Sequence, residues 1–150
     1  NCFLSLKIPE IENVDLDECY RDYKAREKLT EDNRWFCDKC KKKRIASKRF
    51  EIDYWSPYLF IQLKRFKSDI TGTRITKDNT PVNIPLEWRH DYQLNGLVLH
   101  SGSPSGGHYV SAFKINNDWI LFDDARVSKI NENQIKKMAS FAYMLLLKKC

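Results

Sequence analysis

With 150 residues, of which 42% are hydrophobic and 13% aromatic, the chain is long enough to form one domain with a real core. This composition excludes a disordered or low-complexity protein. The longest apolar run, Phe141–Leu147, is far shorter than the roughly 20 residues that a membrane-spanning helix needs. The five cysteines are an odd number and only Cys37 and Cys40 lie close together, so we expect no disulfide framework and an intracellular compartment, cytoplasmic or nuclear.

The net charge of +6 is unevenly distributed along the chain. Seven Lys or Arg and no acid lie between Lys39 and Arg49, which exceeds the whole net charge and leaves the remainder close to neutral. The run Lys41–Arg44 could bind nucleic acid or act as a nuclear address. Because charged residues on exposed turns need no partner, we favour a solvated loop and do not expect nucleic acid or a membrane as a partner.

The N-terminal part predicts one strand and one helix. Cys2–Ile8 has strand-like alternation. From Val14 to about Leu29, apolar residues recur at the spacing of a helix, and Asp15 or Asn13 could cap its start. The residues that share this apolar face are Leu16, Cys19, Tyr20 and Tyr23.

The remainder of the chain predicts short strands and one more helix, Glu132–Ala139. Asp69–Asp78 is polar and contains Gly72, so it predicts a hairpin or mobile loop, whereas Pro81–Pro85 predicts a short edge strand. One helix followed mostly by antiparallel strands indicates an α+β fold, and no α/β alternation supports a nucleotide-binding sheet. The predicted strands are Lys48–Asp53, Tyr58–Phe66, Tyr92–His100, His108–Ile115, Trp119–Phe122, Arg126–Lys129 and Phe141–Leu147.

A pair of glycines introduces His108 at the start of a strand-like run, in the stretch SGGHYVS. A turn at Asn116–Asp118 would fold this strand back as a hairpin and bring His108 beside Asp123. A carboxylate bonded to one imidazole nitrogen fixes the tautomer and stabilises the imidazolium when the other nitrogen takes a proton. Histidine and aspartate also meet at the ends of purely structural hairpins, so the pair by itself leaves both interpretations open.

Five segments occur in an order and at spacings typical of one protein family: Tyr58–Phe66 (YLFIQLKRF), Tyr92–Leu94 leading to His100–Gly102, Gly106–Tyr109 (GGHY), Trp119 with Phe122–Asp124, and Ala142–Leu145 (AYML). Together they resemble the second half of the catalytic domain of the ubiquitin-specific proteases. Phe3–Pro9, the helix near Leu16 and Trp35–Cys40 are similar to the family's run from its fingers into its zinc ribbon. The resemblance covers essentially the whole chain.

The resemblance implies a papain-like cysteine protease fold, mostly antiparallel sheet, that cleaves the bond after the terminal glycine of ubiquitin. Residues 1–56 would belong to the fingers, with the CxxC knuckle and one helix, and residues 57–150 to the palm. By the same resemblance, His108 is the general base, Asp123 orients it and Asp124 is a supporting carboxylate. A diglycine tail offers no side chains, so flat aromatic walls suit it. The residues that match the walls of the channel for this tail are Phe66, His100 and Tyr109.

The family's nucleophile is a cysteine at the head of a helix, where the helix terminus and the imidazolium lower its pKa. Cys2 enters a strand with no helix after it, Cys19 is expected to pack in the core, and Cys150 is terminal. We therefore expect the nucleophile to lie upstream of this chain, in a first half of the catalytic domain that would be its partner.

Cys37 and Cys40 form half of a tetrahedral zinc site, and family members that keep the metal supply a second CxxC before the segment that corresponds to Phe3. A structural zinc is therefore one option, although we do not expect the isolated chain to hold it. Catalysis requires no cofactor. A redox role for the CxxC would need a βαβ setting, which the sequence lacks.

Three functions follow, in order of preference. The first is the C-terminal part of a thiol-dependent deubiquitinase that acts on ubiquitin or ubiquitinated proteins and is inactive without its upstream half. The second is a catalytically inactive ubiquitin-binding or scaffold module of the same fold. The third is a zinc-dependent nucleic-acid module built around Cys37 and Cys40.

Overall fold

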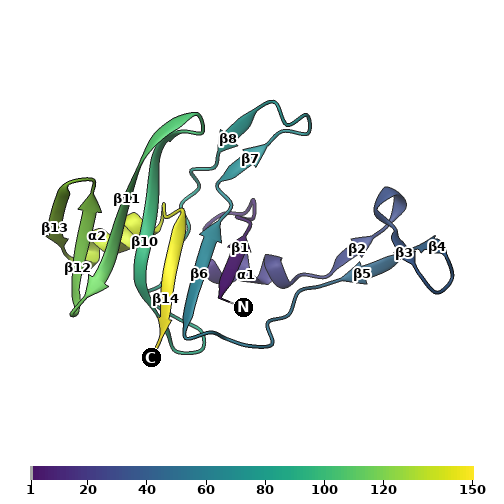
Figure 1. Ribbon diagram of the computed structural model, residues 1–150, viewed down its shortest axis with the longest axis horizontal. Coiled ribbons are helices and arrows are strands. Elements are labelled where there is room, and N and C mark those ends of the chain that lie inside the picture. The colour runs from purple at the N-terminus through teal and green to yellow at the C-terminus, as the bar shows by residue number, and fades with distance from the viewer. Residues whose placement is uncertain (1) are drawn as a thin grey trace.

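The computed structural model describes residues 2–150, and its main body is one large sheet. Its strands run in the order β1-β6-β14-β10-β11-β12-β13, with β9 paired to β10 (Figure 1). All described neighbours are antiparallel except β1 and β6, which are parallel. The expected α+β, mostly antiparallel fold is confirmed. The strands are β1 (Phe3–Leu6), β6 (Tyr58–Leu63), β9 (Glu87–Trp88), β10 (Tyr92–Ser103), β11 (Gly106–Ile115), β12 (Asp118–Asp123), β13 (Arg126–Ile130) and β14 (Met144–Lys149).

One face of this sheet forms the core because apolar side chains alternate along each strand. On β6, Leu59, Ile61 and Leu63 are buried, while Tyr58 and Phe60 point to the other face and are exposed. The buried residues of helices α1 (Leu16–Lys24) and α2 (Glu132–Ala139) belong to the same core cluster. The opposite face of the sheet remains open around β6.

Helix α1 begins where the sequence indicates, because the Glu18 N–H donates to the Asp15 carboxylate at 2.7 Å. It ends at Lys24 rather than near Leu29. Residues Glu27–Leu29 instead form β2, because they pair with the distant strand β5 (Ala46–Lys48) rather than extend the helix. Helix α2 has its predicted bounds and a reciprocal capping box between Asn131 and Gln134.

An arm of paired strands projects from the main body (Figure 1). Its base is the β2–β5 pair, and its end is the hairpin of β3 (Trp35–Cys37) and β4 (Lys42–Arg44). The predicted strand Lys48–Asp53 is wrong, since β5 ends at Lys48 and the chain continues as a loop. Strand β1 and helix α1 pack in the main body, so the arm comprises residues 27–48.

A second hairpin, β7 (Phe66–Ser68) with β8 (Ile75–Lys77), occupies the segment predicted as a hairpin or loop. The strand predicted to reach Phe66 stops at Leu63 because the chain turns at Arg65, whose N–H donates to the Leu63 carbonyl. The edge strand predicted at Pro81–Pro85 is not formed: only Asn83 makes a bridge, to Asp15.

The Arg65 side chain connects separate segments of this region by hydrogen bonds to their backbone carbonyls. It is 2% exposed, and its guanidinium donates to the carbonyls of four residues at 2.7–3.1 Å. Burial lowers its pKa, an effect that nearby Asp78 opposes. Because these carbonyls come from the loop after β8 and from the segment between α2 and β14, Arg65 fixes the β7–β8 hairpin against the main sheet. The four acceptors are Asp78, Thr80, Ser140 and Ala142.

Candidate active site

The turn between β11 and β12 determines which residues meet at the far end of the hairpin. Asn116 and Asn117 have positive φ angles of 49° and 69°, the conformation of a two-residue type I′ turn. The ladder then runs from Ile115 opposite Asp118 to Ser111 opposite Phe122. This register brings His108 beside Asp123, as the sequence predicted.

The His108 imidazole forms a short contact with Asp123. Its Nε2 lies 2.5 Å from Asp123 Oδ1, and its Nδ1 lies 3.9 Å from Asp124 Oδ2. The hydrogen bond to Asp123 and then the charge of Asp124 raise the pKa of His108. The side chains of His108 and Asp123 are 46% and 40% exposed, so the pair is open to an incoming group.

The two ring nitrogens of His108 have different roles in this geometry. Asp123 engages Nε2, so Nδ1 is the nitrogen available to accept a proton from a reacting group. Asp124 lies in the two-residue turn between β12 and β13, with a φ of 50°, and its carboxylate is 82% exposed on the Nδ1 side. This arrangement can take up a proton and stabilise the resulting imidazolium.

Gly107, which precedes His108, is required by close packing. A Cβ at this position would lie 2.2 Å from His100 Nε2 and 2.3 Å from the Ser101 carbonyl oxygen, whereas a Cβ on Gly106 would meet nothing within 4 Å. Gly102, opposite Gly107 on β10, has a φ of 101°. The two glycines let β10 and β11 approach closely where His108 is presented.

The three aromatic residues expected at a tail channel form one cluster. His100 lies between Phe66, which it meets edge-on, and Tyr109, whose ring is tilted against it, with ring centroids 5.3 and 4.7 Å away. A fourth ring, Tyr143, lies 5.8 Å from Phe66 and 6.2 Å from Tyr109, and closes the group. Lys77 Nζ donates to the His100 carbonyl at 2.5 Å and so connects β8 to β10 at this point.

The sequence did not identify Tyr143 as a site residue, although Tyr143 lies in the AYML segment, Ala142–Leu145, that carries part of the family resemblance. Gln62 Nε2 donates to the Tyr143 hydroxyl at 2.7 Å, and Ser5 Oγ donates to Gln62 Oε1 at 3.0 Å. Tyr143 precedes β14, and its N–H donates to the Val98 carbonyl. The available signal was Gln62, a polar residue at an alternate position of an apolar strand, which implied a polar partner on the open face.

None of the cysteines in residues 2–150 lies where it could exchange a proton with His108. Cys2 precedes the edge strand β1, and its carbonyl accepts from the Phe60 N–H. It therefore lies four strand spacings, or about 19 Å, from β11. The Cys150 N–H donates to the Asp91 carbonyl at the start of β10. His108 pairs with Ser101 near the other end of that strand, so Cys150 and His108 are separated by about 30 Å along β10. Cys19 is buried in α1, and burial raises its pKa to about 12.

Cys37 and Cys40 lie together at the turn that ends the arm (Figure 1). Hydrogen bonds from the backbone and side chain of Cys40 lower the pKa of Cys37, and Arg44 Nε donates to Cys40 Sγ at 3.5 Å. Thiolate ligation by zinc would suit such a pair. Within the described chain, however, the only cluster of three or more potential metal ligands is His108, Asp123 and Asp124, so Cys37 and Cys40 have no third potential ligand beside them among residues 2–150.

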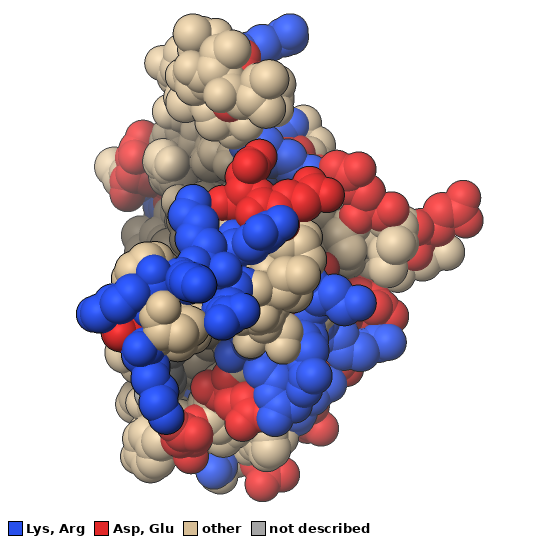
Figure 2. All heavy atoms as spheres, turned by 90° about the vertical axis from the view of Figure 1, so that its right-hand side faces the viewer, with Lys and Arg blue, Asp and Glu red and all other residues tan. Residues whose placement is uncertain are grey.

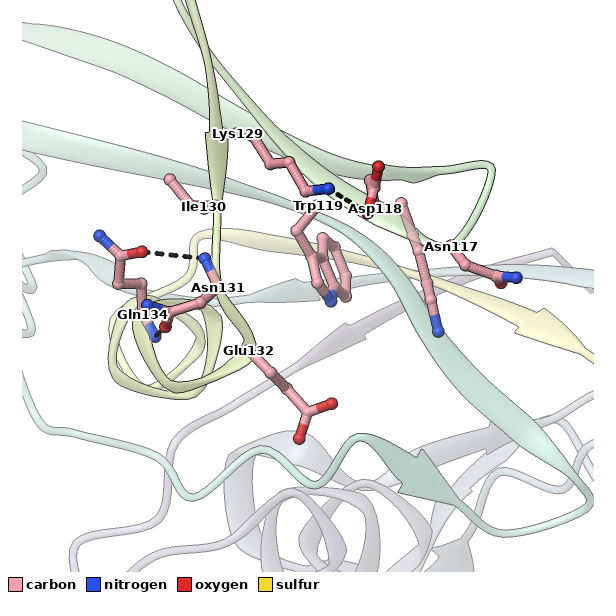
Figure 3. Close-up of a pocket in the computed structure, with 9 residues that line it drawn as sticks. Asn117, Asp118, Trp119, Lys129, Ile130, Asn131, Glu132 and Gln134 are labelled. Atoms are coloured by element: carbon pink, nitrogen blue, oxygen red, sulfur yellow. Dashed lines mark hydrogen bonds and ion pairs between the residues drawn. The ribbon is translucent and has the colours of Figure 1, made fainter.

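A separate cavity of about 530 Å³ lies between β12, β13 and the start of α2 (Figure 3). Trp119 forms one wall, and Lys129 pairs with Asp118 at 2.7 Å across its rim. Asn131 and Gln134 on the opposite wall satisfy each other through the capping box. Asp118 and Asp123 are at opposite ends of β12, so this cavity is distinct from the site around His108.

No helix within residues 2–150 is both long and apolar enough to cross a membrane.

Two known proteins are similar to this chain in sequence over most of its length. The chain is 34% identical to "Ubiquitin carboxyl-terminal hydrolase 4" of Arabidopsis thaliana over 145 residues, covering 89% of this chain and 40% of the relative. It is 32% identical to "Ubiquitin carboxyl-terminal hydrolase 12" of Salmo salar over 148 residues, covering 90% of this chain and 40% of the relative. The chain therefore spans about two fifths of the length of these relatives.

Solved structures share the fold. A yeast SAGA DUB module superposes with a TM-score of 0.83 at 29% identity, over 97% of this chain and 34% of that one. A SAGA DUB module bound to monoubiquitin gives a TM-score of 0.81 at 28% identity, again over 97% of this chain and 34% of the other. The family model described as ubiquitin carboxyl-terminal hydrolase matches residues 25–147. The chain thus belongs to the ubiquitin carboxyl-terminal hydrolase family.

Proposed function

We propose that this chain is the part of a thiol-dependent deubiquitinase that carries its general base and part of its substrate channel, and that the enzyme hydrolyses the bond after the C-terminal glycine of ubiquitin. The observation that carries the proposal is the contact between His108 Nε2 and Asp123, which leaves Nδ1 to exchange a proton with a reacting group. Family membership and the likeness to a module bound to monoubiquitin support it. The odd number of cysteines is consistent with an intracellular enzyme.

In this mechanism His108 Nδ1 takes the proton of a cysteine thiol. The thiolate attacks the carbonyl carbon of the terminal glycine, and a carbon–sulfur bond forms as the carbonyl becomes an oxyanion. The imidazolium, stabilised by Asp123 and Asp124, gives the proton to the leaving amine as the carbon–nitrogen bond breaks. Water, deprotonated by the same imidazole, then hydrolyses the thioester and releases the ubiquitin carboxylate.

The nucleophile belongs to a segment outside the described residues. The cysteines of residues 2–150 lie on other elements or at the far end of the sheet, as their hydrogen bonds and strand positions indicate. The upstream half of the catalytic domain is therefore a required partner. In the papain-like arrangement that we propose, the main sheet is the palm and the arm forms the fingers.

The substrate channel is the aromatic cluster. The ring of Tyr109 is 53% exposed, and it lies one residue from His108 on the neighbouring position of β11. Such rings can enclose a glycine-only tail and exclude branched side chains at the same place. Phe66, His100 and Tyr109, joined by Tyr143, would thereby select an extended diglycine end.

A structural zinc, if bound, would be held by Cys37 and Cys40 together with two ligands from beyond residues 2–150. It would cross-link the end of the arm to that second segment. It supplies nothing to the reaction, which depends on His108 at the other end of the molecule.

The test is hydrolysis of a fluorogenic amide of the ubiquitin C-terminus by the intact protein. His108→Ala should lower kcat about 1,000-fold, because a positioned base contributes roughly 10²- to 10⁴-fold. His90→Ala is the matched control: this histidine packs against Trp55, with ring centroids 4.4 Å apart, and its loss should leave kcat unchanged. An intact protein that binds ubiquitin but never hydrolyses the amide would instead establish the inactive ubiquitin-binding module.

A further inference from the structure

The two strands that carry His108 extend beyond the strands on either side of them (Figure 1). Strand β14 accompanies β10 only as far as Val98, and β12 accompanies β11 only from Ser111 onward. Among the described strands, the remaining ends, residues 99–103 and 106–110, pair only with each other and form a two-stranded ribbon. A two-stranded ribbon is marginally stable by itself in water, so its surroundings decide how firmly His108 is held.

Beyond Val98, the edge of β10 that faces β14 carries backbone carbonyls without a strand partner. In an antiparallel strand, every second residue directs its N–H and C=O to the same neighbouring strand. On this edge the Val98 carbonyl accepts from the Tyr143 N–H at 2.7 Å, so His100 and Gly102 present their carbonyls to the same side. Carbonyls at a partly buried sheet edge need another donor once the neighbouring strand has ended.

The side chain of Lys77 supplies this donor. Its Nζ lies 2.5 Å from the His100 carbonyl oxygen and makes a longer contact of 3.5 Å with that of Gly102, so one ammonium group takes the place of the missing strand. Lys77 is the last residue of β8 and pairs with Phe66 of the aromatic cluster. Because Arg65 binds the loop after β8 through two hydrogen bonds, Lys77 is held at a fixed place relative to the main sheet.

The charge around Lys77 shows that its contact with β10 is not a by-product of ion pairing. The excess positive charge lies in residues 26–49, with ten Lys and Arg against four Asp and Glu, and Figure 2 shows Lys and Arg gathered at the end of the arm. The rest of the chain contains sixteen charges of each sign. On the same hairpin, Lys67 pairs with Asp78 at 3.0 Å and with Glu10 at 3.4 Å. Lys77 forms no ion pair within residues 2–150, and its ammonium is directed to backbone carbonyls instead.

We propose that Lys77 is a positioning residue for the general base: by closing the free edge of β10, it fixes the two-stranded ribbon and thereby the place of His108 relative to Asp123. Lys77 contacts β10 on both sides of Ser101, the residue that pairs with His108. The contact with Asp123 holds only the imidazole, whereas Lys77 acts on the backbone that carries it. The role of Lys77 rests on the proposed function, in which His108 is the general base of a deubiquitinase, and adds a residue from a separate hairpin to that site.

The experiment compares Lys77→Met, Lys77→Arg and Lys67→Met in the intact protein. Methionine keeps much of the apolar stem but cannot donate, so kcat for the fluorogenic ubiquitin amide should fall about 10- to 100-fold, the cost of misplacing a catalytic group by roughly 1 Å. Arginine restores the donors and should return kcat to within about threefold of the wild-type value. Lys67→Met is the matched control and should leave kcat unchanged, because Lys67 forms ion pairs on the same hairpin but has no hydrogen bond to β10.

A second readout follows His108 directly and does not depend on hydrolysis. The hydrogen bond to Asp123 raises the pKa of His108, so a displaced ribbon weakens this bond and lowers the pKa towards the ordinary value of 6.5. A histidine NMR titration, with the His108 signal assigned by its absence from His108→Ala, should show this fall in Lys77→Met and in neither of the other two variants. Urea unfolding of the same variants measures the general loss of stability separately.

Three results would overturn the proposal. If Lys77→Met loses stability but keeps the wild-type kcat and His108 pKa, Lys77 only tethers the hairpin. If kcat falls while the His108 pKa is unchanged, Lys77 acts on the substrate channel and not on the base. If Lys77→Arg is as slow as Lys77→Met, the loss of hydrogen-bond donors is not the cause.

Failure of the proposed function gives a different result. The wild-type protein would then not hydrolyse the amide, or His108→Ala would keep the wild-type rate. The NMR titration would still decide whether Lys77 positions His108, because it reads the contact between His108 and Asp123 and not the reaction.

Discussion

Replacing Gly107 by alanine should damage the candidate site through packing alone. The new Cβ would lie 2.2 Å from His100 Nε2 and 2.3 Å from the Ser101 carbonyl oxygen, both about 1 Å inside normal contact. Ser101 O belongs to the backbone of β10, and the His100 ring lies between Phe66 and Tyr109. Neither can yield easily, so we expect a loss near the upper end of the overpacking range, about 3 kcal/mol, with His108 displaced from its position.

The measurement is urea unfolding of the intact protein, together with hydrolysis of the fluorogenic ubiquitin amide. The adjacent Gly106→Ala substitution is the control, since its Cβ meets nothing within 4 Å and its φ lies outside the left-handed region. Gly107→Ala should lower both stability and kcat, while Gly106→Ala should change stability by less than about 0.5 kcal/mol. Equal behaviour of the two variants would refute the packing explanation of the glycine pair.

Three further predictions concern Arg65, the His108 pair and the CxxC. Arg65→Met should cost about 3–5 kcal/mol in urea unfolding because four carbonyls, one buried and three partly buried, lose a charged donor, whereas the exposed neighbour Lys64→Met should cost under about 0.5 kcal/mol. Asp123→Asn should lower the pKa of His108 in an NMR titration, because the hydrogen bond to Asp123 raises that pKa in the native protein. The pair therefore stabilises the fold below the ordinary histidine pKa of 6.5, and this stabilisation is lost as the pH rises through the raised pKa. A variant whose stability keeps the native pH dependence would contradict the assignment. Elemental analysis of the isolated chain should find less than one zinc per molecule, and stoichiometric zinc abolished by Cys37→Ser would show that a complete site exists within it.

The sequence predicted the strands of the main sheet well because their apolar residues alternate and their turns contain Asn, Asp or Gly. The type I′ turn at Asn116–Asn117 is the clearest case, and it was sufficient to place His108 beside Asp123. Errors arose where a long-range partner decides the local conformation. Glu27–Leu29 continues the polar pattern of α1 but pairs with β5, and the segment after Lys48 has strand composition but no partner strand.

The sequence did not predict those parts of the candidate site that depend on contacts between residues far apart in the chain. Tyr143 joins the aromatic cluster by ring contacts with Phe66 and Tyr109, and its hydroxyl accepts a hydrogen bond from Gln62, 81 positions away in the chain; no periodicity connects these residues.

The central claim, that His108 activates a cysteine from outside residues 2–150, is tested most directly with a ubiquitin probe that carries a thiol-reactive C-terminal group. Wild-type intact protein should give one covalent ubiquitin adduct, mapped by mass spectrometry to a cysteine outside this chain, and His108→Ala should slow its formation at least 100-fold. An adduct on Cys2, Cys19, Cys37, Cys40 or Cys150, or an adduct that forms at the wild-type rate with alanine at position 108, would contradict the account.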